Sequence, residues 1–70
     1  MTDFRYWTDE GGSWRRVDFN YVLTKTKGKM IAKVEDQQKD GTGFMLYLAN
    51  GAIVQFLYED DTIGIHYMTA

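Results

Sequence analysis

The sequence predicts an all-β domain, a six-stranded antiparallel meander with no long helix. Apolar residues alternate with a period of two along most of the 70 residues, which is the spacing of side chains on one face of a strand. Turn-forming dipeptides separate these runs, namely Gly11-Gly12, Lys27-Gly28, Asp40-Gly41 and Asn50-Gly51. Proline is absent and 16% of the residues are aromatic, a composition opposite to that of disordered chains.

Length and composition fit a single domain over residues 1–70. A chain of this size buries only about 60% of its unfolded surface. It contains no cysteine, so neither disulfides nor a thiolate zinc site can stabilise it. Stability must then come from a compact core or from a second chain. No apolar stretch approaches membrane-spanning length and no signal peptide is recognisable, so we expect a cytoplasmic protein.

The first expected strand covers residues 3–8 and the second covers residues 14–25, which are rich in aromatic and β-branched side chains. A two-residue turn at Gly11-Gly12 places Tyr6 opposite Val17, and the same register sets Trp7 against Arg16. Residues 14–27 also fit helical spacing, but the strict alternation from residue 17 to residue 23 favours a strand.

The strongest local signal is Asn50-Gly51, which predicts a hairpin with a two-residue type I′ turn. That turn places Leu46 opposite Gln55. A loop with an even number of residues at Glu59-Asp60-Asp61-Thr62 then places Ile63, Ile65 and Tyr67 on the same face as Val54, Phe56 and Tyr58. In this register His66 lies opposite Gln55. An earlier turn at Asp40-Gly41 would set Val34 against Tyr47, although a longer loop fits equally well.

If every turn contains an even number of residues, one inner face runs across all six strands. Its members are Phe4, Tyr6, Val17, Phe19, Tyr21, Leu23, Met30, Ala32, Val34, Met45, Tyr47, Ala49, Val54, Phe56, Tyr58, Ile63, Ile65 and Tyr67. Two arrangements can bury this face: the sheet curls into a small barrel or roll, or two sheets pair face to face in a homodimer.

The outer face of the last three strands is also apolar, which a small monomer does not require. The side chains expected there are Phe44, Leu46, Leu48, Ile53 and Leu57, with Met68 nearby. If exposed, they form a patch of the size that marks an interface, so we expect them to bind a partner. The alternative is that they are intramolecular core.

A basic set suggests a second kind of partner. It comprises Arg15, Arg16, Lys25, Lys27, Lys29 and Lys33. On a hairpin tip beside aromatic residues, such side chains could meet the phosphates of a nucleic acid. The other interpretation is that lysines protect a sheet edge from aggregation.

Catalytic and metal-binding motifs are lacking in the sequence. His66 is the one histidine, and opposite Gln55 we expect it to form a cross-strand polar pair. The three adjacent acids Glu59, Asp60 and Asp61 lack the spaced ligands of a calcium loop. We therefore expect no enzyme, no metal and no cofactor.

Residues 44–65 carry a local resemblance to the first strands of a polo box. The resemblance rests on Leu48-Ala49-Asn50-Gly51, on Phe56, and on Asp60-Asp61-Thr62-Ile63. Polo boxes continue with further strands and a long C-terminal helix, which do not follow here, and none of their phosphate-contacting residues can be placed. The resemblance implies a β-sheet module for protein interaction.

The sequence thus predicts a non-catalytic protein-binding module. Every Lys and Arg lies in residues 1–40, so the expected apolar patch has an acidic surround that suits a basic partner surface. The small size is typical of an adaptor or of an inhibitor of a larger enzyme, including phage-type inhibitors. The alternative is a small nucleic-acid-binding barrel.

Overall fold

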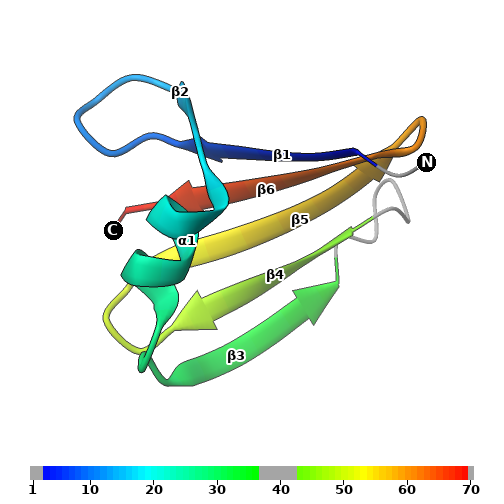
Figure 1. Cartoon of the computed structure of the whole chain (residues 1–70). Coiled ribbons are helices and arrows are strands. Elements are labelled where there is room, and N and C mark those ends of the chain that lie inside the picture. The colour runs from blue at the N-terminus through cyan, green and yellow to red at the C-terminus, as the bar shows by residue number, and fades with distance from the viewer. Residues whose placement is uncertain (1–2, 37–42, 70) are drawn as a thin grey trace.

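The fold, given by a computed structural model that describes residues 3–36 and 43–69, is one six-stranded mixed sheet crossed on one face by a single short helix (Figure 1). Strands dominate, as predicted. The elements in chain order are β1 (Asp3–Thr8), β2 (Arg15–Val17), α1 (Phe19–Thr26), β3 (Ile31–Asp36), β4 (Gly43–Leu48), β5 (Ile53–Glu59) and β6 (Thr62–Met68).

The strand order is β2-β1-β6-β5-β4-β3. The last four strands form the predicted antiparallel meander. The first two do not continue it, because β1 pairs in parallel with β6. The sheet is open, with β2 and β3 as its two edges, so of the two arrangements expected for it, the closed barrel is wrong.

A helix replaces most of the predicted second strand. Asp18 has the extended backbone of an N-cap, and its Oδ1 accepts a hydrogen bond from the Tyr21 amide at 2.9 Å. Phe19, Val22 and Leu23 then follow at helical spacing. Because α1 ends at Thr26, no lysine hairpin forms at Lys27-Gly28, where one was predicted.

The β4–β5 loop has three residues instead of the predicted two. The Gly51 amide donates to the Leu48 carbonyl at 3.0 Å, and the Leu48 amide donates to the Ala52 carbonyl at 2.8 Å. Gly51 has a φ of 94°, so this is a turn followed by a left-handed residue, the usual three-residue hairpin loop. The predicted register is therefore wrong by one residue, and Leu46 lies opposite Val54.

Two other hairpin registers are confirmed. In the β5–β6 turn, Asp60 and Asp61 have φ values of 47° and 62°, as a type I′ turn requires. Gln55 lies opposite His66 as expected. In the β1–β2 hairpin, Trp7 lies opposite Arg16, whose guanidinium carbon is 6.0 Å from the Trp7 ring centroid.

Between β3 and β4 the register differs from the prediction. Val34 lies opposite Leu46, and Lys33 takes the position opposite Tyr47. An irregularity between Ile31 and Lys33 shifts the pairing there. The turn predicted at Asp40-Gly41 lies outside the described residues.

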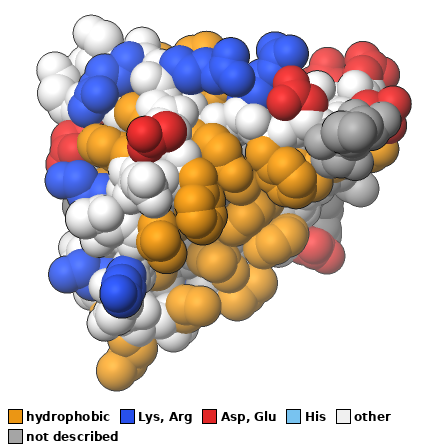
Figure 2. Space-filling view, viewed as in Figure 1, with side chains coloured by type: hydrophobic (Ala, Val, Ile, Leu, Met, Phe, Trp, Pro, Cys, Tyr) orange, Lys and Arg blue, Asp and Glu red, His pale blue; other side chains and the backbone are white. Residues whose placement is uncertain are grey.

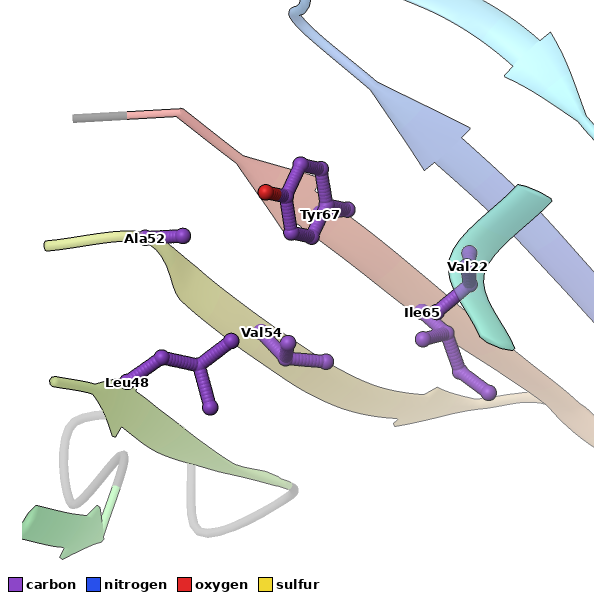
Figure 3. Close-up of a cluster of buried hydrophobic side chains, with 6 residues drawn as sticks. All are labelled: Val22, Leu48, Ala52, Val54, Ile65 and Tyr67. Carbon is purple, nitrogen blue, oxygen red and sulfur yellow. The ribbon is translucent and has the colours of Figure 1, made fainter. Parts of the chain in front are cut away.

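The core of the described residues is small and lies under α1. Val22 of the helix faces the sheet near Ile65 (Figure 3). The buried apolar residues are Val22, Leu48, Ala52, Val54, Ile65 and Tyr67. Thr8 is completely buried beside them, and its hydroxyl donates to the Tyr67 carbonyl at 2.9 Å. Six buried apolar side chains are few even for a domain of this size.

Candidate protein interface

The two faces of the sheet differ in what covers them. We call the face that carries Val54 and Ile65, on which α1 packs, the helix side, and the face that carries Gln55 and His66 the open face. A helix is about 10 Å wide, whereas seven-residue strands such as β5 and β6 are about 23 Å long. The helix crosses the strands at one end and leaves the other end of the helix side uncovered (Figure 1).

Large apolar side chains are exposed at and around that uncovered end. Phe4 and Tyr58 are 49% and 48% exposed and both lie opposite Ile63 on neighbouring strands. Val34, which lies opposite Leu46, is 61% exposed. Figure 2 shows hydrophobic side chains gathered over this face. We call the following set the helix-side surface: Phe4, Phe19, Leu23, Ile31, Val34, Phe44 and Tyr58.

An apolar groove of about 330 Å³ runs between α1 and the sheet. Phe19 and Leu23 of the helix form one wall. The floor contains Leu46 and Phe56, and the Phe56 ring stacks on Phe44 with centroids 4.7 Å apart. The groove therefore continues the helix-side surface inward to the core.

Opposite charges mark the two ends of the helix side. At the end under the helix terminus, Lys27 caps α1, and Lys29 lines the groove. At the far end, Asp36 closes β3 opposite Phe44, and Asp60 and Asp61 form the β5–β6 turn. Near β3, the helix side is thus basic at one end and acidic at the other, along the direction of the strands. Farther from β3, the helix end also carries Asp18 and Glu10, the latter paired with Lys25.

The predicted partner-binding residues do not share one face. Phe44 and Leu46 lie opposite Phe56 and Val54, on the helix side, and Leu48 belongs to the core at 5% exposure. The remaining members of the predicted set lie on the open face, namely Ile53, Leu57 and Met68. The cause is the three-residue β4–β5 loop, which turns β4 over relative to the expected register.

The predicted basic set is also dispersed. Lys25 pairs with Glu10 at 2.9 Å and Lys33 pairs with Glu35 at 3.0 Å. The remaining members are Arg15, whose guanidinium lies over the Tyr21 ring, Arg16 on β2, Lys27 and Lys29. They do not converge on a hairpin tip.

Glu35 is held on the open face by two neighbours. Its carboxylate accepts hydrogen bonds from Lys33 and from the Tyr47 hydroxyl, and the Lys33 bond in particular keeps the pKa of Glu35 below its usual value. The same carboxylate raises the pKa of Lys33 and of Tyr47. Lys33 is therefore committed to a local pair.

The open face carries a second, more polar hollow of about 340 Å³, lined by residues that include Arg5, Leu57, Gly64 and His66. His66 Nδ1 lies 3.3 Å from the Gln55 side-chain oxygen, in the expected polar pair. Burial lowers the pKa of His66. Among the described residues, no three His, Asp or Glu side chains are placed to hold a metal ion.

No family model matches this sequence, and neither a curated protein nor a solved structure matches it. What the structure itself defines is a class: a small mixed-sheet domain with one covering helix and an apolar face left half covered. Within residues 3–36 and 43–69, no helix is long and apolar enough to cross a membrane.

The sequence interpretation missed Phe19 and Leu23 as surface residues because it placed them in a strand. The signal was present: Asp18 is a good N-cap, and Phe19, Val22 and Leu23 follow at i, i+3 and i+4. Residues 17–23 also alternate in hydrophobicity closely enough to be taken for a strand.

Proposed function

We propose that this chain is a non-catalytic protein-binding module and that the helix-side surface is its interface. The observation that carries the proposal is the placement of large exposed apolar residues on one side. Seven of them, each 40–61% exposed, lie on the helix side. The largest apolar patch of a typical monomer covers about 300–600 Å². At these exposures the seven side chains present roughly 700 Å².

The chemistry of the helix side supports binding over catalysis. Its groove is lined mainly by aliphatic and aromatic side chains, with Lys29 at one end. Among the described residues, the groups that have a shifted pKa, such as His66 and Glu35, lie on the open face. A catalytic site needs titratable groups that converge on one cleft, and the groove does not provide them.

The sheet edges are poor alternatives for a partner. Edge strand β2 has three residues and carries Arg15 and Arg16. Edge strand β3 has an irregular pairing at its start and a paired lysine, Lys33, at its centre. Short strands, bulges and lysines are the features that protect edges from strand addition. A partner is therefore expected on the face, as for an adaptor or an inhibitor that docks by an apolar surface.

Site-specific photo-crosslinking tests this function in the source cells. A benzoyl-phenylalanine at position 44 or 58 replaces an exposed aromatic ring on the helix side, and the same probe at position 14 is a matched control. Trp14 is 53% exposed and its ring lies 5.4 Å from that of His66, on the open face. We expect protein adducts at positions 44 and 58 and not at position 14. Adducts at none of the three, or equally at all three, contradict the proposal.

A further inference from the structure

We propose that the occupant of the helix-side surface is a second copy of this chain, in a symmetric dimer whose two-fold axis lies across the strands. The inference rests on the proposed function and names its partner. Two faces that pack together by a two-fold axis require that axis to lie in the contact plane. It can run along the strands or across them, and the distribution of side chains distinguishes the two.

The position of α1 favours an axis across the strands. Such an axis exchanges the two ends of the sheet, so the helix of each copy lies over the uncovered end of the other. The uncovered length is about 13 Å, the difference between a seven-residue strand and a helix diameter. That is room for one further helix. An axis along the strands would instead stack helix on helix and leave Phe4 and Tyr58 uncovered.

The helix itself carries the side chains that such a contact needs. Phe19 and Leu23 lie one turn apart on the flank that faces the groove, and they are 54% and 42% exposed. Asn20 and Thr24, which are also exposed, carry no charge. A helix that faces water usually places charged residues on its outer side, and the one charged residue within α1, Lys25, is paired with Glu10.

Charge gives the same orientation independently. Lys29 lies two residues before β3 and Asp36 ends it, so the two lie at opposite ends of a six-residue strand about 17 Å long. An axis across the strands places Lys29 of one copy beside Asp36 of the other, twice per dimer. An axis along the strands instead places the β3 edge of each copy over the β2 edge of the other, so Lys29 and Asp36 do not meet.

The available area also suits a dimer. A specific interface buries about 800 Å² on each partner, and the helix-side surface presents roughly 700 Å² before its polar rim is included. The core of the described residues contains six buried apolar side chains. A domain of this size commonly needs oligomerisation, a metal or disulfides for stability, and the chain has no cysteine. A second copy would extend the core.

Light scattering and sedimentation of the purified chain over a wide concentration range test the dimer directly. We expect a particle of twice 8.2 kDa. Leu23→Glu should raise the dimer dissociation constant at least about 100-fold, because it places a charge in the centre of both symmetric contacts. The control Ser13→Glu, in the exposed loop between β1 and β2, should leave dimerisation unchanged. Circular dichroism reports whether each variant is folded.

A charge exchange tests the orientation without touching the core. Lys29→Glu and Asp36→Lys should each weaken the dimer about tenfold, and the double variant should return it to within about threefold of the original. A dimer that ignores Leu23→Glu, or charge variants that are not mutually rescued, overturns this arrangement. A chain that is monomeric at every concentration overturns the self-partner.

The two proposals fail in different ways. If the chain is monomeric but the probes at positions 44 and 58 still give adducts with another protein, the dimer is wrong and the protein-binding function stands. If the chain is monomeric and no adduct forms, both are wrong. Adducts of twice the chain mass support both.

Discussion

Phe44 on β4 and Phe56 on β5 lie directly opposite each other with their rings stacked, the centroids 4.7 Å apart and the planes 14° apart. The pair exists because the β4–β5 loop contains three residues. In the two-residue turn that Asn50-Gly51 favours, Phe44 would lie opposite Leu57 and point to the other face. One loop residue thus decides to which face of the sheet β4 directs Phe44, Leu46 and Leu48.

Gly43, next to this pair, should be intolerant of any side chain. A Cβ atom there would lie 2.0 Å from the Phe56 backbone oxygen, which cannot move away without breaking the β4–β5 ladder. We expect Gly43→Ala to lower the free energy of unfolding by about 3 kcal/mol. Gly64→Ala is the matched control, because its nearest contact is the His66 side chain at 3.4 Å, and it should cost less than about 1 kcal/mol. Urea denaturation measures both, and equal losses would contradict the close approach.

The N-cap of α1 should make a measurable contribution to stability. Asp18→Ala removes the oxygen that accepts from the Tyr21 amide, and we expect a loss of about 1 kcal/mol. Asp18→Asn keeps an oxygen in that position and should lose clearly less. If the two variants unfold at the same denaturant concentration, the cap does not act as described. A larger loss of helical circular dichroism than of sheet signal would indicate that α1 melts first.

The β5–β6 turn can be improved. Asp61 has a φ of 62°, which glycine adopts without the steric cost of a Cβ. Asp61→Gly should therefore stabilise the protein by about 0.5–1 kcal/mol, although it removes a 3.3 Å hydrogen bond from the exposed Tyr58 hydroxyl. The midpoint temperature of thermal unfolding should rise by several degrees for a domain of this size. The opposite change at Gly51, with its φ of 94°, should lower it, so Gly51→Ala serves as the comparison.

His66 should give stability a pH dependence near neutrality. Burial lowers the pKa of His66 in the folded state, so as pH falls the unfolded state binds the proton first. Stability from this source is complete above the unfolded pKa of about 6.5. It declines as pH falls from that value through the lower folded pKa. Urea denaturation at pH 7.5, 6.5 and 5.5 should show this decline.

His66→Gln is the control for that decline, because it keeps a polar group opposite Gln55. The loss of stability between pH 7.5 and 5.5 should be smaller in this variant than in the original chain. Equal losses would assign the pH dependence to other groups.

Local signals predicted local structure and failed where two local structures share one pattern. The β5–β6 register was correct because its two turn residues and both flanking strands agree. Asn50-Gly51 was misassigned because a glycine with positive φ serves a two-residue turn and also ends a three-residue loop. Residues 17–23 satisfy periods of two and of 3.6 together, and the cap at Asp18 decides in favour of the helix.

The parallel pairing of β1 with β6 has no local signal, since it joins residues about 60 positions apart. The predicted inner face was correct in part: Phe4, Val34 and Tyr58 do share it with Val54. Met45 and Tyr47 do not, because β4 is turned over. The sequence could not indicate that one short helix would cover only part of this face.

The position of β1 also orders the events of folding. In the sheet β1 lies beside β6, which is synthesised later, so β1 cannot complete its pairing until β6 has left the ribosome. Contacts of such long sequence separation make folding slow, on the scale of milliseconds to seconds. Meanwhile the hairpins of β3, β4 and β5 can form early, with their apolar strands still accessible. Aggregation competes with folding during that interval, and a chaperone that shields these strands would raise the yield of native protein.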